Sequence, residues 1–389
     1  VPAAWPAGLG AAARAAEAVE LAGSRLARSL AGAARGERRR QARMGRMLAD
    51  PAARDLIFAL TDEVLRVDDP ALAARRFAAI VSAHPPTAVG LLDRVLMRSG
   101  AVVAPLLPRL VMPLVSKRVK AETRGIVLSS ADPAFADHVR TRWAQGVRLN
   151  VNPLGEAILS DAEAAARMRL VCERIDRPDV DHVSVKISSV VADLDAFAFD
   201  ASVDRVCERL VELYRRAQAA DPVTFVNLDM EEYRDLEMTL QAFVRVLSLP
   251  EFTAIDAGIV LQAYLPDSHD ALERLGAWAT ARRAAGGGRV RVRLVKGANL
   301  AMERVEAELH GWVAAPYATK AEVDASYKAM LDRALRPEWA DALRIGVASH
   351  NLFDVAWALL RARDAGALDR VEFEMLEGMA NAQRRALFE

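Results

Sequence analysis

The chain is short of cysteine, of lysine and of net charge, and two of these shortages exclude classes of protein. Its 389 residues include two cysteines, too few for the disulfide framework of a secreted domain, so we expect a reducing compartment. Lys+Arg and Asp+Glu both number 52. Nucleic-acid binders usually show a basic excess, so we expect no nucleic-acid partner for this segment.

Long hydrophobic runs, a signal peptide and common nucleotide motifs are also missing. The most apolar stretch, residues 101–115, is interrupted by three prolines and an arginine and is too short to span a bilayer. The N-terminus lacks the apolar block of a signal peptide, so we expect a cytoplasmic protein. No G-x-G-x-x-G or Walker motif occurs, and the six histidines show no metal-ligand spacing. The sequence therefore predicts neither a Rossmann site nor a metal centre.

The two halves of the chain differ in the secondary structure that their hydrophobic patterns predict. Residues 1–140 read as helical throughout and predict an N-terminal arm and α domain. From 141 to 389, β-rich runs alternate with amphipathic helices, which predicts parallel strands joined by helical crossovers. The seven predicted strands are 147–151, 182–188, 224–230, 258–264, 289–297, 343–349 and 371–376. The helices between them start near Ser160, with a capping box to Glu163, and cover 202–219, 233–248, 268–284, 322–335 and 352–364.

Two architectures fit this alternation, an open doubly wound sheet and a (β/α)8 barrel. Strands that are covered on both faces read as continuous apolar runs. These strands alternate instead, as where Val183 and Val185 oppose Ser184 and Lys186. The apolar side chains should face the helices, so the polar ones should share an interior. The pattern predicts an α/β fold, a (β/α)8 barrel that is truncated after its seventh strand.

The predicted interior carries charges of both signs. The column consists of Lys186, Asp229, Arg291, Arg293, Glu372 and Glu374. Buried charges persist where they are paired or used. The column is therefore either a set of structural ion pairs or an active site at the carboxyl ends of the strands, where barrel enzymes carry their chemistry.

Two segments at strand ends each have two interpretations. Residues 296–298 either let a ligand approach backbone N–H groups or form a plain turn into a helix. Residues 349–351 either bind a phosphate or a polar ring edge, or cap a helix through His350. Cys172 and Cys207 lie in predicted helices and are expected to pack there rather than act as nucleophiles.

Five motifs, one per strand and in order, resemble those of the proline dehydrogenase family, most closely the proline dehydrogenase part of the bifunctional flavoenzymes called proline utilization A. The motifs are Val183–Ser188, Leu228–Tyr233, Val260–Tyr264, Val292–Ala298 and Ala348–Asn351. The resemblance implies a distorted (β/α)8 barrel that holds FAD. It also implies oxidation of L-proline to Δ1-pyrroline-5-carboxylate, with electrons passed to a membrane quinone by a peripherally membrane-associated protein.

The resemblance assigns roles to single residues. Asp229 and Arg293 would be the catalytic pair, and Lys186 would contact the substrate carboxylate. Leu294 would pack on the proline ring, and Asn299 stands where many bifunctional members carry a tyrosine that helps enclose it. The residues expected to line the FAD are Met230, Gln262, Arg293, Lys296, Gly297, Ala298, Ser349 and His350, with Ser349 replacing a more usual threonine.

The chain also departs from the family at its end. The chain starts at Val1 and stops at Glu389, and the family's eighth strand and last helix would lie beyond that residue. We therefore expect the sequence to be a fragment of a longer protein. The family's last helix carries an arginine pair that clamps the substrate carboxylate. Arg384-Arg385 is not that pair, since it follows the seventh strand directly.

We therefore expect a longer parent protein with a downstream aldehyde dehydrogenase domain. We also expect residues 1–389 alone not to oxidise proline. The alternatives are another flavin-binding barrel oxidoreductase, such as a methylenetetrahydrofolate-reductase-like protein, or a non-catalytic scaffold.

Overall fold

The structure is a computed structural model of the chain. It describes residues 9–33, 42, 50–51, 55–56, 59–64, 67, 69–84, 91–122, 133–153, 158, 160–378 and 381–388. These residues divide into two compact units, one drawn mainly from segments 1–26 and 131–376, the other from segments 27–130 and 377–387. Within the described ranges, no helix is both long enough and apolar enough to cross a membrane.

The second unit is helical where it is described, in agreement with the sequence. It contains a short π-helical turn, Leu60–Val64, followed by α4 (Pro70–Ala83), α5 (Leu91–Val103) and α6 (Pro108–Glu122). Asp69 caps α4, because its carboxylate accepts the backbone N–H groups of the first turn. The core of this unit is apolar and centres on Phe77, with Leu60, Val81 and Met112 buried in the same cluster.

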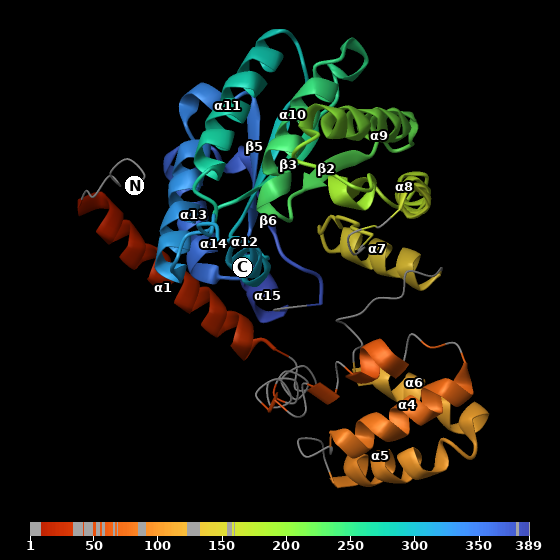
Figure 1. Cartoon of the computed structure of the whole chain (residues 1–389). Helices are drawn as coiled ribbons and strands as arrows, with labels where there is room; N and C mark the ends of the chain where they lie inside the picture. The colour runs from red at the N-terminus through yellow and green to blue at the C-terminus, as the bar shows by residue number, and fades with distance from the viewer. Residues whose placement is uncertain are drawn as a thin grey trace. The chain divides into compact units, whose positions relative to one another are not determined.

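The first unit is built on one sheet of six parallel strands. The strands are β1 (His182–Lys186), β2 (Phe225–Asp229), β3 (Ala257–Gln262), β4 (Val290–Val295), β5 (Leu343–Ala348) and β6 (Val371–Glu374). Their spatial order is their order in the sequence, and all five pairings are parallel. A doubly wound sheet reverses its strand order at one point. This sheet does not, and it curls as half of a TIM-like barrel (Figure 1).

The predicted strand at 147–151 is wrong as a strand. Only Val151 pairs, as a single parallel bridge to Val183. Its N–H donates to the carbonyl of His182, and its carbonyl accepts from Ser184 N–H. Pro153 follows two residues later, and a proline has no N–H with which to extend a ladder. The segment therefore takes the place of a strand next to β1 with one residue in register.

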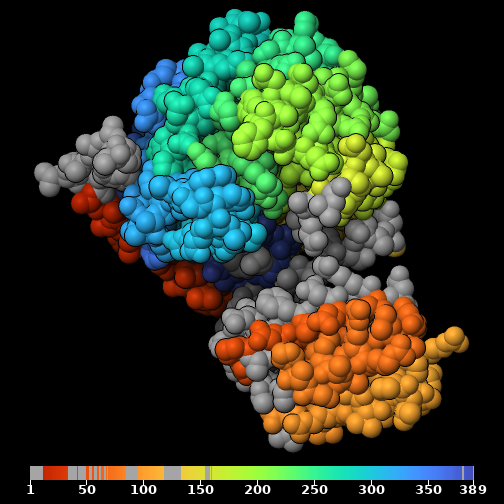
Figure 2. All heavy atoms as spheres, viewed as in Figure 1, coloured from red at the N-terminus to blue at the C-terminus, as the bar shows by residue number. Residues whose placement is uncertain are grey.

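Helices flank the sheet along the chain, and several of them cover its outer face. They are α7 (Ala134–Ala144), α8 (Asp161–Ile175), α9 (Phe199–Ala219), α10 (Leu236–Leu247), α11 (Ser268–Ala284), α12 (Leu300–His310), α13 (Lys320–Ala334) and α14 (Leu352–Asp364). The outer surface in Figure 2 shows α8 to α11 in succession, from yellow to teal. Two further helices, α1 (Leu9–Ala31) and α15 (Asn381–Phe388), lie near the ends of the chain.

Helix spacing explains how this cover forms. On α9, Val206, Leu210, Leu213 and Ala217 recur at intervals of three and four residues and are all buried. Ser160 accepts the Glu163 N–H at the start of α8, as predicted. A complete reciprocal capping box is formed at α13, between Thr319 and Glu322, where the sequence analysis did not expect one.

The inner face of the sheet is polar, and two glycines make room for its side chains. A Cβ on Gly258 would collide with the amide oxygen of Asn227, and one on Gly346 would collide with Glu374. Gly346 pairs in register with Arg293 on the neighbouring strand. Glycine at these strand positions is therefore what allows long charged side chains to lie across the interior.

Candidate active site

The centre of the interior is an arginine held between two carboxylates. Arg293, on β4, places Nη1 2.8 Å from Asp229 Oδ1 and Nη2 2.8 Å from Glu374 Oε2. Asp229 ends β2 and Glu374 ends β6, so the arginine bridges strands on both sides of its own. The Arg293 side chain is 8% exposed, and a buried cation of this kind needs such partners. Three members of the predicted charged column are thus brought together at the carboxyl ends of the strands.

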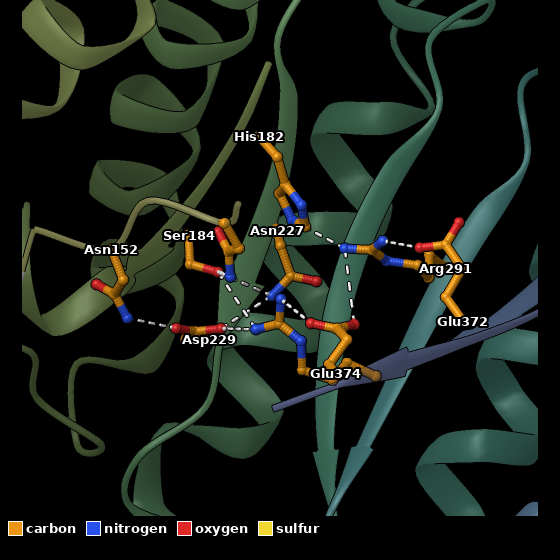
Figure 3. A network of polar contacts seen from close by, with 10 residues as sticks. Asn152, His182, Ser184, Asn227, Asp229, Arg291, Glu372 and Glu374 are labelled. Carbon is orange, nitrogen blue, oxygen red and sulfur yellow. Dashed lines mark hydrogen bonds and ion pairs between the residues drawn. The ribbon is translucent and has the colours of Figure 1, made fainter. Parts of the chain in front are cut away.

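Asp229 is held by amides as well as by the arginine. Asn152 Nδ2 donates to its Oδ2 at 2.7 Å, and Asn227 Nδ2 donates to its Oδ1 at 2.9 Å (Figure 3). Asn150 donates to Ser184 Oγ at 2.8 Å, so the face predicted for the 147–151 segment is right although its ladder is not. Burial raises the pKa of Asp229, and the positive charge of Arg293 opposes that rise.

A second ionic layer lies at the amino-terminal side of the first. Arg291 forms ion pairs with Glu372 and donates to His182 Nε2 at 2.8 Å. It also lies over the ring of Phe225, with its guanidinium carbon 4.5 Å from the ring centroid. Burial, followed by the nearby arginines, holds the pKa of His182 well below its usual value, so the neutral ring accepts this bond. These contacts are ion pairs and hydrogen bonds of the kind that a structural role requires, and His182 was not among the predicted site residues.

The mouth of the sheet carries the lysine that was assigned to substrate. Lys186, the last residue of β1, places Nζ 2.7 Å from Glu231 Oε1. The backbone carbonyl of Glu231 accepts hydrogen bonds from Gln262 Nε2 and from Asn299 Nδ2, both at 3.2 Å. Three predicted site residues thus converge on Glu231. The sequence analysis did not single out this residue, although it lies inside the motif of 228–233.

Lys296 belongs to a cluster of alternating charges beyond the end of β4. Its Nζ lies 2.5 Å from Asp324 Oδ1 and 2.6 Å from Asp354 Oδ2, and Lys328 lies 2.8 Å from the other oxygen of Asp354. Asp354 is 1% exposed. Burial is the largest single influence on the pKa of Lys296 and acts to lower it. The hydrogen bonds and charges of the two carboxylates together outweigh burial, so the pKa is raised above its usual value. The sequence analysis missed both aspartates, which lie on α13 and α14.

Backbone geometry explains the glycine that follows this lysine. Gly297 has φ +124°, a conformation that favours glycine, and a Cβ there would collide with the Tyr264 ring. The glycine is therefore required by close packing within the turn. Gly297 and Ala298 are themselves exposed, so their backbone also remains open to a ligand.

One of the two interpretations of residues 349–351 is wrong, because His350 does not cap the helix that follows. Asn351, rather than His350, caps α14, because its side chain accepts the N–H of Phe353 at 3.0 Å. Ser349 Oγ accepts from the Asn351 N–H and donates to Asp354. His350 Nε2 accepts the N–H of Leu376, while its Nδ1 is buried with no hydrogen-bond partner.

Two apolar residues assigned to ligands lie close to the same edge. Met230 directly follows β2 and is 8% exposed. Leu294 is fully buried and alternates with Arg293, so it lies on the face opposite to the arginine. Contact of either side chain with a bound ligand stays a prediction.

The cysteines and the terminal arginines are not among the residues of these clusters. Cys172 and Cys207 lie half-buried in α8 and α9, and burial raises the pKa of each thiol. The thiolate is the nucleophilic form, so both are poor nucleophiles. Arg385, in α15, donates to the backbone carbonyl of Ser29. No group of three or more potential metal ligands occurs among the residues that the structure describes.

Comparison with known proteins gives one family match. Residues 135–389 match the sequence profile of a family described as proline dehydrogenase. The matched region includes every residue of the arginine–carboxylate centre and of the lysine cluster. A comparison with curated protein sequences finds no match.

Solved structures of proline utilization A (PutA) are similar to this chain. The protein from Corynebacterium freiburgense is 46% identical, with a TM-score of 0.66, over 76% of this chain and 30% of that one. PutA from Bdellovibrio bacteriovorus, inactivated by N-propargylglycine, is 24% identical, with a TM-score of 0.76, over 96% of this chain and 38% of that one. The second likeness concerns the fold alone. The chain therefore spans about a third of the length of these structures.

Proposed function

Because the chain belongs to the proline dehydrogenase family, we propose that it forms the site at which L-proline is oxidised to Δ1-pyrroline-5-carboxylate with FAD as oxidant. The observation that carries the proposal is Arg293, held between Asp229 and Glu374 at the carboxyl ends of the strands. Barrel enzymes place their active sites at this edge.

The residues at this edge fit a flavin. A flavin ring presents polar edges, and two buried side-chain atoms here have no hydrogen-bond partner, Gln262 Oε1 and His350 Nδ1. The exposed backbone of residues 297–298 and the ammonium of Lys296 would suit the polar and anionic parts of FAD. Met230, Arg293, Ala298 and Ser349 would complete the lining.

The reaction removes a hydride from the carbon next to the ring nitrogen and a proton from that nitrogen. When bound, FAD would accept the hydride and so take up the two electrons. The protein contributes position and electrostatics. Lys186 would bind the substrate carboxylate by a charge-assisted contact. Arg293 would supply positive charge where negative charge develops, and Asp229 and Glu374 would keep it oriented.

The wider role follows from the length of the relatives. The PutA structures are roughly three times as long as the part that this chain matches, which is 30% and 38% of their lengths. A further solved structure that is similar to this chain is described as a bifunctional PutA protein. We propose that this chain is the proline-oxidising part of such a protein, linked to a downstream aldehyde dehydrogenase domain. A membrane quinone would then receive the electrons, which requires peripheral contact between a cytoplasmic protein and the membrane.

The test uses the full-length protein and follows the product. Incubation with L-proline and an artificial dye acceptor should yield Δ1-pyrroline-5-carboxylate, trapped with o-aminobenzaldehyde, in a 1:1 ratio with reduced dye. Absence of flavin absorbance after FAD reconstitution would favour a scaffold instead. Bound flavin that is not reduced by proline would favour another flavin barrel.

A further inference from the structure

The lysine that proline would need is already paired with a carboxylate of the protein. Lys186 Nζ lies 2.7 Å from Glu231 Oε1. An ammonium that holds one carboxylate at this distance must release it, or share it, when a second carboxylate binds. The Glu231 side chain therefore stands where an incoming substrate carboxylate would make its contact.

The backbone of Glu231 is anchored by hydrogen bonds, whereas its side chain is partly exposed to solvent. Gln262 and Asn299 both donate to its backbone carbonyl at 3.2 Å, which anchors the residue at the mouth of the sheet. The carboxylate end is different, because the side chain is 35% exposed and that of Lys186 is 19% exposed. A partly exposed ion pair is weak, so water can take over the glutamate at small cost.

The neighbouring acid cannot take this role. Asp229 is the register partner of Lys186 on β2. Its two oxygens, however, already accept hydrogen bonds from Arg293, Asn152 and Asn227. Of these two carboxylates, Glu231 is the one that pairs with the lysine at the mouth, and the one with a route into solvent.

We propose that Glu231 acts as an internal competitor for the substrate carboxylate, and that a monocarboxylate ligand binds at Lys186 by displacing it. The proposal rests on the proposed function for its substrate, L-proline. Glu231 is then a specificity-determining residue. A ligand without a carboxylate that occupies this space must break the ion pair without offering Lys186 a replacement, so the pair selects against such ligands.

The first arm of the test measures affinity for L-proline in the full-length protein. Glu231→Gln removes the competing charge and should lower KM for L-proline about two- to fivefold, the range set by a partly exposed ion pair. Glu232→Gln is the matched control, because its carboxylate pairs with Arg234 at 2.6 Å instead, and its KM should not change. Glu231→Ala should reproduce the gain. Addition of Lys186→Met should abolish it.

The second arm does not depend on turnover. Reductive methylation with 13C-formaldehyde labels the lysines of the full-length protein, and the signal that is lost in Lys186→Arg identifies Lys186. Acetate serves as the minimal carboxylate. The Lys186 signal should respond to acetate at a lower concentration in Glu231→Gln than in the wild type.

The outcomes separate the two hypotheses. A lower KM together with tighter acetate binding supports the competitor. An unchanged or raised KM with unchanged acetate binding overturns it. Tighter acetate binding in a protein that does not oxidise proline would uphold displacement at Lys186 and refute the proposed function.

Discussion

Arg293 and Asp229 form a 2.8 Å ion pair across the interior of the sheet, from β4 to β2, with β3 between them. Val260, a small apolar residue, is the register partner of Arg293 on that intervening strand. The arginine can therefore reach past it to the aspartate. The position of the guanidinium therefore depends on residues of three strands and not on the Arg293 side chain alone.

The charge of Arg293 should matter more than its bulk. Arg293→Met should slow flavin reduction by proline and lower the flavin potential, because the reduced anion loses a nearby cation. Arg293→Lys should restore part of both. Anaerobic stopped-flow absorbance and a dye-equilibrated potential measure these effects. A normal rate and potential in Arg293→Met would make it a structural ion of the interior.

Lys186→Ala should raise KM for L-proline strongly while FAD stays bound. A lost charge-assisted contact costs ~1.5–3 kcal/mol, or roughly ten- to a hundredfold in KM. Lys117→Ala is the control, because Lys117 is an exposed lysine on α6 in the other unit. Steady-state kinetics of the full-length protein decide the matter. Equal KM values in the two variants would remove the carboxylate role from Lys186.

Asp354→Asn should weaken flavin retention beyond its cost in stability. The change leaves Lys296 and Lys328 without their shared buried carboxylate and should lower the free energy of unfolding by about 1–3 kcal/mol, since both lysines are partly exposed. Asp332→Asn breaks a comparable pair with Arg361, 2.7 Å apart, between the same two helices. Flavin-to-protein ratios after dialysis should fall in the first variant only. Equal flavin retention in the two variants would show that the lysine cluster does not contribute to cofactor binding.

Asp235 should make the stability of the protein depend on pH. Burial, followed by the charge of Glu232, raises its pKa to about 6 from the ordinary value of 3.8. The folded protein holds this proton more tightly than the unfolded chain. The contribution is therefore fully present below pH 3.8 and is lost as pH rises through about 6.

Relative to Asp235→Asn, the wild type should lose up to about 3 kcal/mol of unfolding free energy across that window. Urea denaturation of both proteins at several pH values measures the difference. A difference that is constant with pH would show that Asp235 titrates normally.

Strand alternation predicted much of the site from sequence. It placed Arg293 and Asp229 on one inner face because that period depends on local backbone geometry. The same reasoning failed at 147–151, where the residues read as a strand but Pro153 limits the ladder to one bridge. The face of Asn150 was nevertheless right, since it depends only on alternation.

Partners that come from distant helices could not be predicted in this way. Asp324 and Asp354 reach Lys296 from α13 and α14, and a helical period alone does not say which strand end a helix will face. The pairing of Lys186 with Glu231 is hidden for another reason. Glu231 lies after the end of β2, where alternation no longer fixes the direction of a side chain.

The central claim is that this arrangement oxidises proline through a flavin, and an anaerobic titration tests it most directly. The full-length protein, reconstituted with FAD, is titrated with L-proline in the absence of any acceptor while its visible spectrum is recorded. We expect the flavin band to bleach with proline and the bleaching to be slowed in Arg293→Met. A flavin band unchanged by saturating L-proline in the wild type would contradict it.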